Sequence, residues 1–241
     1  MSSFIVPDLI YSNFNRLKNN RPGMEIMRRY LERQRWKTIL FFVLIYAVGV
    51  AGLQLPQTEK FFILLIPIAL LISFIAILLF HKSLNSANTR FVFFLIFLLS
   101  FLVEVTRISS TEIFGNLSFG EGLGFKLFAT PAMIGIYWVM LVYCSASIME
   151  RFKLPNSLKI LSSSLLILLY DLVLEQIAPF FDMWHWKHDS VPLLNYLVWF
   201  ILAVCFHTLV KWKKVKTENP LAPAIFICQF LFFLGILLLF K

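Results

Sequence analysis

The sequence has few charged residues for its length. Only 15% of its 241 residues are charged and 59% are apolar, whereas soluble domains carry about 25% charged and roughly 45–50% apolar residues. This balance excludes a soluble single-domain enzyme. A transmembrane β-barrel is excluded as well, because barrel strands alternate polar and apolar residues and the apolar runs of this chain are continuous.

Cysteine and histidine are also scarce. The three cysteines, Cys144, Cys205 and Cys228, fall separately within apolar runs, so we expect neither disulfides nor a cysteine-bound zinc ion. Four histidines are too few for the histidine-rich di-iron centres of membrane desaturases. The last apolar run contains no lysine that could carry a retinal Schiff base. We therefore expect no metal and no other cofactor.

Long apolar runs make up most of what remains. A helix needs about 20 apolar residues to cross the hydrocarbon core of a bilayer, and seven runs approach or reach this length. They predict an all-α fold, a polytopic membrane helix bundle with about seven transmembrane helices. The expected spans are 38–55, 61–80, 91–108, 127–149, 160–181, 192–210 and 221–240.

The basic residues indicate how these helices are oriented. The formal net charge is +9, but the lysines and arginines are spread between apolar runs, so nucleic acid is not an expected partner. Most of them lie in segments on the same face of the membrane as the N-terminus, and the positive-inside rule predicts that this face is cytoplasmic. Residues 1–37 are expected to be a basic segment, either a short helix on an anionic membrane surface or a solvated leader. Residues 38–241 are expected to form a single transmembrane bundle.

Three acidic residues fall within the predicted spans, where an ionisable group costs roughly 2.5–3.5 kcal/mol. At about 1.5 Å per residue, Glu104, Asp171 and Glu175 reach a similar depth in the outer third of the bundle. Asp171 and Glu175 share a helix face because they are four residues apart. Asn195 reaches the same end, as do six aromatic residues: Tyr137, Trp138, Trp184, Trp186, Tyr196 and Trp199. The sequence predicts a pocket of acids and aromatic rings that opens to the outer leaflet.

Such a pocket suits the protonation of an alkene. A carboxyl group among apolar side chains favours its neutral form and can then donate a proton, while aromatic rings stabilise a neighbouring cation by about 0.5–2 kcal/mol each. We expect Asp171 or Glu175 to donate the proton, and Glu104 or Asn195 to orient the water that captures the cation. Two other interpretations remain open: Glu104 pairs with Arg107, or the acids form structural hydrogen bonds between helices.

The loop after residue 181 allows a further interpretation. His185 and His188, with Asp182 and Asp189, are residue types that bind metals, although histidine and tryptophan are common at membrane interfaces without any metal. A proton-coupled transporter could also use buried acids as relays. That function would require polar residues to continue into the cytoplasmic half, where the sequence offers only Ser162 to Ser164 and His207.

Two blocks of sequence resemble the carotenoid biosynthesis protein family. The first contains FLVEV (101–105), IFG (113–115), FGEGLGFKLFATP (119–131), IGIYW (134–138) and YCSASI (143–148); the second contains YDLVLEQIAPFFDMWHW (170–186) and VPLLNYLVWF (191–200). The resemblance covers roughly residues 91–210. It implies a multi-helix protein of the bacterial inner membrane. It also implies a hydratase, of the lyase class, that adds water to the terminal C=C of an acyclic carotenoid, as bisanhydrobacterioruberin hydratase does.

The resemblance also implies partners and site residues. The partners are a carotenoid or other polyisoprenoid substrate, the lipid bilayer, and possible further carotenoid enzymes. Asp171, Glu175 and Asn195 match the family's second block together with Trp184, Trp186, Tyr196 and Trp199. The first block departs from the family pattern, because Arg107 replaces a glycine and Tyr137 replaces an asparagine. A non-catalytic carotenoid or lipid binder, and a scaffold for other pigment enzymes, are therefore alternatives to the hydratase.

Overall fold

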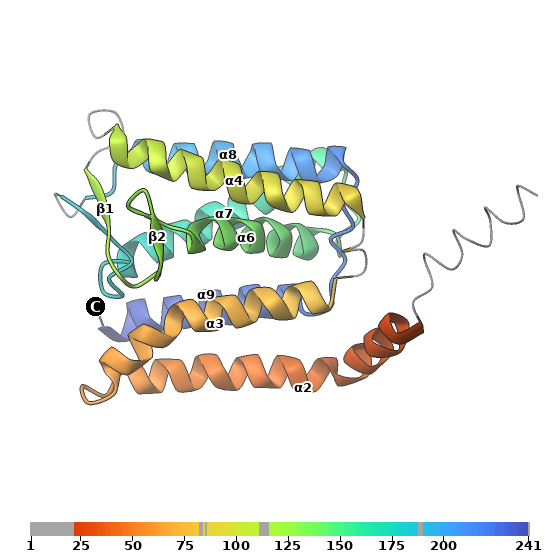
Figure 1. Ribbon diagram of the computed structural model, residues 1–241, viewed down its shortest axis with the longest axis horizontal. Coiled ribbons are helices and arrows are strands. Elements are labelled where there is room, and N and C mark those ends of the chain that lie inside the picture. The colour runs from red at the N-terminus through yellow and green to blue at the C-terminus, as the bar shows by residue number, and fades with distance from the viewer. Residues whose placement is uncertain (1–21, 82–83, 85, 111–115, 188–189, 241) are drawn as a thin grey trace, which may run out of the picture.

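The computed structural model describes residues 22–81, 84, 86–110, 116–187 and 190–240. Within these residues the chain forms seven helices and four short strands (Figure 1). The helices are α2 (Pro22–Leu53), α3 (Glu59–Leu79), α4 (Ala87–Ser109), α6 (Met133–Met149), α7 (Asn156–Ile177), α8 (Leu193–Trp212) and α9 (Ala222–Phe240). The strands are β1 (Leu117–Phe119), β2 (Lys126–Leu127), β3 (Thr130–Pro131) and β4 (Trp184–Trp186).

The helices confirm the prediction of an all-α membrane bundle. Six of them, all except α6, are long and apolar enough to cross a bilayer, and the chain is an integral membrane protein. α2 continues without a break from Pro22 through the boundary expected at residue 37, and Figure 1 shows its first turns inclined to the rest of the helix. The cytoplasmic position of the N-terminus stays a prediction.

Helix α6 differs from the span predicted at 127–149. It begins only at Met133 and has 17 residues, because the preceding segment forms a hairpin of β2 and β3. Phe128 and Ala129, at the tip of the hairpin, have φ angles of 50° and 60°, which a right-handed helix does not allow. The apolar residues of the hairpin therefore belong to a turn, and the hydropathy of the sequence did not reveal this.

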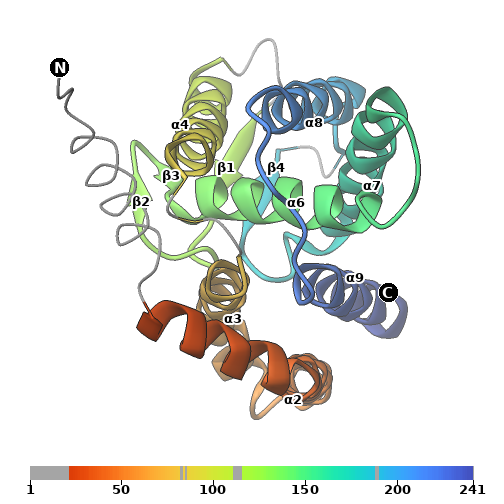
Figure 2. The same ribbon diagram turned by 90° about the vertical axis from the view of Figure 1, so that its right-hand side faces the viewer.

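Helix α6 occupies the centre of the bundle. Figure 2 shows it crossing obliquely between α4, α7, α8, α3 and α9, and every residue from Tyr137 to Ser147 is buried. Close packing requires Gly135, where an added Cβ atom would lie 2.5 Å from the ring of Phe97 on α4. A helix enclosed by other helices makes little contact with lipid, so it does not need the roughly 20 apolar residues of a lipid-facing span.

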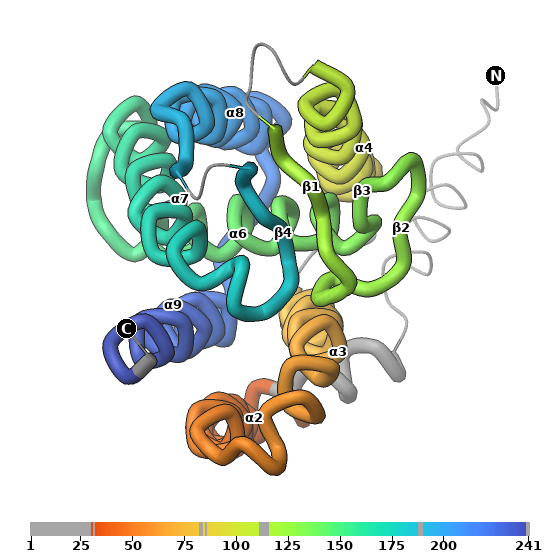
Figure 3. The backbone as a smooth tube through the Cα atoms, turned by 90° about the vertical axis from the view of Figure 1, so that its left-hand side faces the viewer, coloured from red at the N-terminus to blue at the C-terminus, as the bar shows by residue number. Residues whose placement is uncertain are grey.

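The four strands lie together at one end of the bundle, called the strand end below (Figure 3). β1 pairs antiparallel with β4, so that Leu117 faces Trp186 and Phe119 faces Trp184. The tight turn after β1 holds this pair against the loop before β4, where Gly122 N donates a hydrogen bond to Asp182 O at 2.8 Å. Side chains alternate along a strand, so Trp184 and Trp186 are buried while His185 is exposed.

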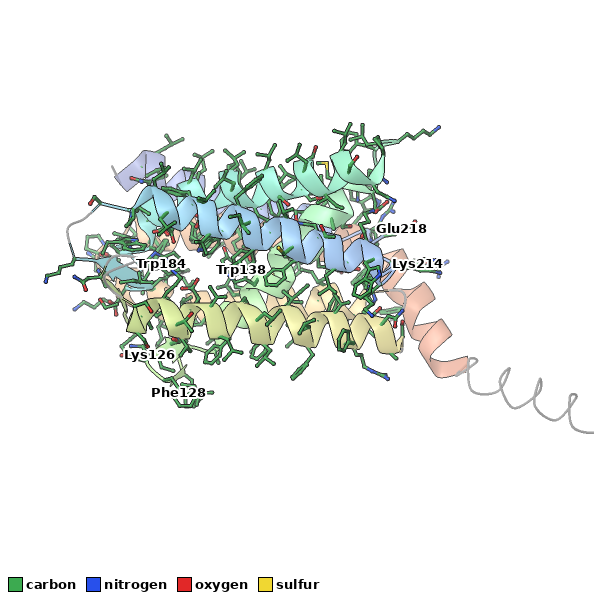
Figure 4. The ribbon with its side chains drawn as sticks, turned by 90° about the horizontal axis from the view of Figure 1, so that it is seen from above. Lys126, Phe128, Trp138, Trp184, Lys214 and Glu218 are labelled. Atoms are coloured by element: carbon green, nitrogen blue, oxygen red, sulfur yellow. The ribbon has the colours of Figure 1, made fainter. Side chains whose placement is uncertain are left out.

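The opposite end of the bundle carries most of the described basic residues and is called the basic end. Glu150, which caps α6 there, accepts hydrogen bonds from Lys159 and Lys211. Burial alone would raise the pKa of the Glu150 carboxyl, but these two hydrogen bonds and the two positive charges outweigh it and hold the pKa below its usual value. Figure 4 shows Lys214 and Glu218 at this end, and Trp184 and Lys126 at the strand end.

Candidate functional site

The predicted acids and aromatic residues meet inside the bundle near the strand end. Helices α4, α7 and α8 supply the charged and amide side chains, α6 supplies Tyr137 and Trp138, and the β1–β4 pair closes the site from outside. The carboxyls of Glu104, Asp171 and Glu175 are all buried. These residues form two layers, one joined by hydrogen bonds between its side chains and one with mostly unpartnered polar atoms.

The hydrogen-bonded layer begins with an ion pair on α4. Arg107 Nη1 donates to both carboxylate oxygens of Glu104, at 2.7 and 2.9 Å, and Arg107 Nη2 donates to Asn195 Oδ1 on α8. The guanidinium also lies over the ring of Trp186, 5.7 Å from its centroid. The ion pair expected as an alternative for Glu104 is present, and it links α4 to α8 through Asn195.

Glu175 completes this layer with three hydrogen bonds. Asn195 Nδ2 donates to its Oε1 at 2.7 Å, and the indole N–H groups of Trp184 and Trp186 both donate to its Oε2 at 2.9 Å. A carboxylate that accepts three N–H donors is well suited to remain ionised. The β1–β4 pairing is what directs both indoles inward, so the strands position the donors of Glu175.

The unpartnered layer lies one helical turn deeper. Asp171 precedes Glu175 by four residues on α7, and Trp199 follows Asn195 by four residues on α8. The two helices are antiparallel neighbours (Figure 1), so the Glu175–Asn195 hydrogen bond places Asp171 and Trp199 at a common level. The ring of Trp138 packs against that of Trp199 in a tilted arrangement, with 4.6 Å between ring centroids and 40° between ring planes. Figure 4 shows Trp138 nearer the middle of the bundle than Trp184.

Five residues make up this unpartnered layer: Tyr137, Trp138, Tyr170, Asp171 and Trp199. Among the described residues, both oxygens of Asp171 and the two indole N–H groups have no hydrogen-bond partner, and Arg107 Nε has none either. The two tyrosine hydroxyls interact with each other but make no hydrogen bond of normal geometry. A buried polar group without a partner costs about 1–3 kcal/mol. Because these side chains lie at one level of the bundle, this level suits a bound polar molecule rather than an apolar core.

A narrow pocket lies beside the hydrogen-bonded layer and reaches Trp199 of the unpartnered layer. It is lined by Glu104, Arg107, Glu175 and Trp199 with the apolar residues Leu117, Phe119 and Ile134 and the ring of Trp184, and it encloses about 210 Å³ including its opening. Its innermost space fits about one water molecule. Acids and aromatic rings both line the pocket, as the sequence predicted, but a polyene end needs the surrounding side chains to open.

The remaining predicted residues lie around this core. Tyr196 is half-buried and lies within electrostatic range of Glu175 and Asp171. His185 donates to Asp182 at 2.8 Å, and this hydrogen bond, with a second from the backbone N–H of Glu121, holds the pKa of the exposed Asp182 carboxyl below its usual value. Across the described ranges no three acids, histidines or cysteines converge on a metal position.

Some predicted features fall outside the described residues. His188 and Asp189 of the possible metal cluster lie there, as does the IFG segment at 113–115.

Tyr170 is the residue of the site that sequence reasoning missed. Its ring packs against Tyr137 at 6.1 Å and against Phe226 and Phe233 of α9 at 5.2 and 5.8 Å. A signal was present, because Phe226, Phe230 and Phe233 recur at the spacing of one helix face and indicate an aromatic surface on α9. The partner of that surface could not be read from the sequence, because it depends on how α7 and α9 pack.

A second polar cluster lies deeper, toward the basic end. His207 is buried and hydrogen-bonded to Ser145 at 2.9 Å and to Ser164 at 3.2 Å. The fully buried Ile167 and Ala203 lie between this cluster and Asp171 along α7 and α8. The two polar clusters are therefore separated by an apolar layer.

The comparisons with known proteins show the family of this chain. The model of the family described as carotenoid biosynthesis protein matches residues 60–241, which include α3 to α9 and every residue of both layers. No curated protein and no solved structure matches the chain.

Proposed function

Because the chain belongs to the carotenoid biosynthesis protein family and acts in carotenoid metabolism, we propose that it is a hydratase of the bacterial inner membrane. Its substrate is an acyclic carotenoid whose terminal C=C enters the unpartnered layer from the bilayer. The reaction adds water across that double bond and needs no redox cofactor. The hydrocarbon substrate reaches the site through lipid, which fits a pocket enclosed by membrane helices.

The observation that carries this proposal is the isolation of Asp171. Glu104 and Glu175 both accept hydrogen bonds from N–H donors, whereas neither oxygen of Asp171 has a partner among the described residues. An ionised carboxylate without a partner is expensive in an apolar interior. Asp171 is therefore the carboxyl of this site best suited to hold a proton and to donate it, and Glu175 is better suited to stay ionised.

The proposed reaction has two steps. The O–H bond of Asp171 breaks as its proton joins the inner alkene carbon, which bears one hydrogen, and the π electrons leave a tertiary cation on the outer carbon, which bears two methyl groups. A water oxygen then bonds to this cation, and the water returns a proton to the Asp171 carboxylate. The sum is one alkene plus one water giving one tertiary alcohol, with the protein restored.

The aromatic residues of the unpartnered layer suit the cationic intermediate. Trp138, Trp199, Tyr137 and Tyr170 surround the level of Asp171, and Tyr137 is close enough to Asp171 to interact with it electrostatically. Each ring face stabilises a cation by about 0.5–2 kcal/mol, and by more when the site excludes water. The same rings protect the cation from uncontrolled reaction with solvent.

A proton pathway across the membrane is less well supported. Such a pathway requires polar groups that follow one another from Asp171 toward the basic end. The buried apolar side chains of Ile167 and Ala203 interrupt this series of polar groups between Asp171 and His207.

The test is to express the chain in a bacterial host that makes lycopene, an acyclic carotenoid, and to analyse the extracted pigments by mass. A hydratase is expected to give a new pigment heavier than lycopene by one water, and a control host with the empty vector is expected to give lycopene alone. Lycopene that copurifies with the protein at unchanged mass would instead support a non-catalytic binder and contradict the hydratase.

A further inference from the structure

Hydration requires a water molecule bound beside the cation, so a residue of the site must hold this water. The tertiary cation has two fates: capture by water gives the alcohol, and loss of a proton gives back the alkene. The partition between them depends on whether a water oxygen is held against the cation. A residue that holds this water therefore decides the product without taking part in the protonation.

Two unpartnered N–H donors of the described residues belong to side chains that line the narrow pocket. These are Trp199 Nε1 and Arg107 Nε. The guanidinium of Arg107 is already fixed by Glu104 and Asn195. Trp199 instead lies at the level of Asp171, and its ring packs in a tilted arrangement against the ring of Trp138. Trp199 therefore both lines the pocket and lies at the same helical level as Asp171, the proposed acid.

We propose that Trp199 holds the nucleophilic water of the hydration, through a hydrogen bond from its indole N–H to the water oxygen. This role rests on the proposed function. A water has four tetrahedral positions. Trp199 N–H fills one lone pair and the carboxylate of Glu104, which also lines the pocket, accepts one hydrogen. The carboxylate left on Asp171 after proton transfer accepts the other hydrogen, and the second lone pair faces the cationic carbon. The pocket has room for about one water molecule, which matches this demand.

The experiment measures the two fates of the cation separately. Purified protein in detergent is incubated with lycopene in deuterated water, and both the hydrated product and the recovered lycopene are analysed by mass. Trp199→Phe keeps an aromatic ring and removes the N–H donor. We expect it to lower hydrated product by about 10- to 100-fold, while deuterium in the recovered lycopene rises, because cations that are not captured lose a proton.

Two further variants separate this role from a structural one. Trp199→His restores an N–H donor on a smaller ring and is expected to recover part of the hydration. Trp212→Phe makes the same chemical change as Trp199→Phe at an exposed position of the basic end and is expected to behave as the wild type. Monodispersity and the unfolding midpoint of each variant are measured alongside.

The outcomes distinguish this inference from the proposed function. Wild-type protein that neither hydrates lycopene nor exchanges deuterium overturns the proposed function, and the role of Trp199 falls with it. If the wild type hydrates lycopene and Trp199→Phe does so equally well, only the role of Trp199 is overturned. A Trp199→Phe variant that loses both hydration and exchange overturns it too, because Trp199 then acts before the cation forms. Equal loss of hydration in folded Trp199→Phe and Trp199→His also contradicts it.

Discussion

Replacement of Arg107 by methionine is expected to destabilise the fold by about 3–5 kcal/mol, because it breaks a buried ion pair and leaves the charge of Glu104 without a partner. The same change removes the donor to Asn195, which in turn donates to Glu175. Methionine keeps much of the volume of the arginine, so the loss reflects charge and hydrogen bonding rather than a cavity. The measurement is the thermal unfolding midpoint in mild detergent.

The matched control removes both charges of the pair. In the double variant Arg107→Met with Glu104→Gln no unpaired carboxylate remains, so we expect most of the lost stability to return, and a double-mutant cycle measures the coupling. Single and double variants that both keep the wild-type midpoint would show that the pair contributes little and that the links between α4, α7 and α8 depend on packing.

Replacement of Asp171 by asparagine is expected to reduce hydration of lycopene by at least about 100-fold, the usual contribution of a positioned general acid. The amide has nearly the shape of the carboxyl but cannot supply the proton, and it adds no charge to the buried site. The fold and the capacity to bind lycopene are therefore expected to persist. The readout is the ratio of hydrated pigment to lycopene in the producing host, corrected for the amount of protein in the membrane.

Asp182→Asn is the control for that experiment. It makes the same substitution in an exposed carboxyl at the strand end, away from both layers, and it keeps an acceptor for the Glu121 N–H. We expect unchanged hydration. An undiminished hydrated product in Asp171→Asn would remove Asp171 from the mechanism and leave Glu175 as the remaining candidate for the acid.

The helices of this fold could be predicted because they depend on local properties of the chain. The apolar length of a run determines whether it spans a bilayer, and the constant rise of a helix is enough to place Glu104, Asp171 and Glu175 at a similar depth. The hydrogen-bonded pair of Glu175 and Asn195 agrees with that depth. Residue spacing was sufficient to bring the candidate site to one end of the bundle.

The layering of the site could not be predicted in the same way. It depends on the β1–β4 pairing, which joins residues far apart in sequence and directs Trp184 and Trp186 onto Glu175. The strands are only three residues long and leave no clear alternation to read. Glu175 is paired and Asp171 is isolated because Asn195 and the two indoles reach only Glu175, and these contacts depend on tertiary packing. The sequence therefore left Asp171 and Glu175 as equal candidates for the proton donor.

The claim that this pocket adds water to an alkene is tested most directly by the origin of the oxygen in the product. Purified protein is incubated with lycopene in water enriched in heavy oxygen, under air, and the product is analysed by mass. The account predicts a hydroxylated carotenoid that carries the heavy oxygen of the water. A product hydroxyl that carries oxygen from air, or lycopene recovered unchanged by a folded protein that binds it, would contradict the account.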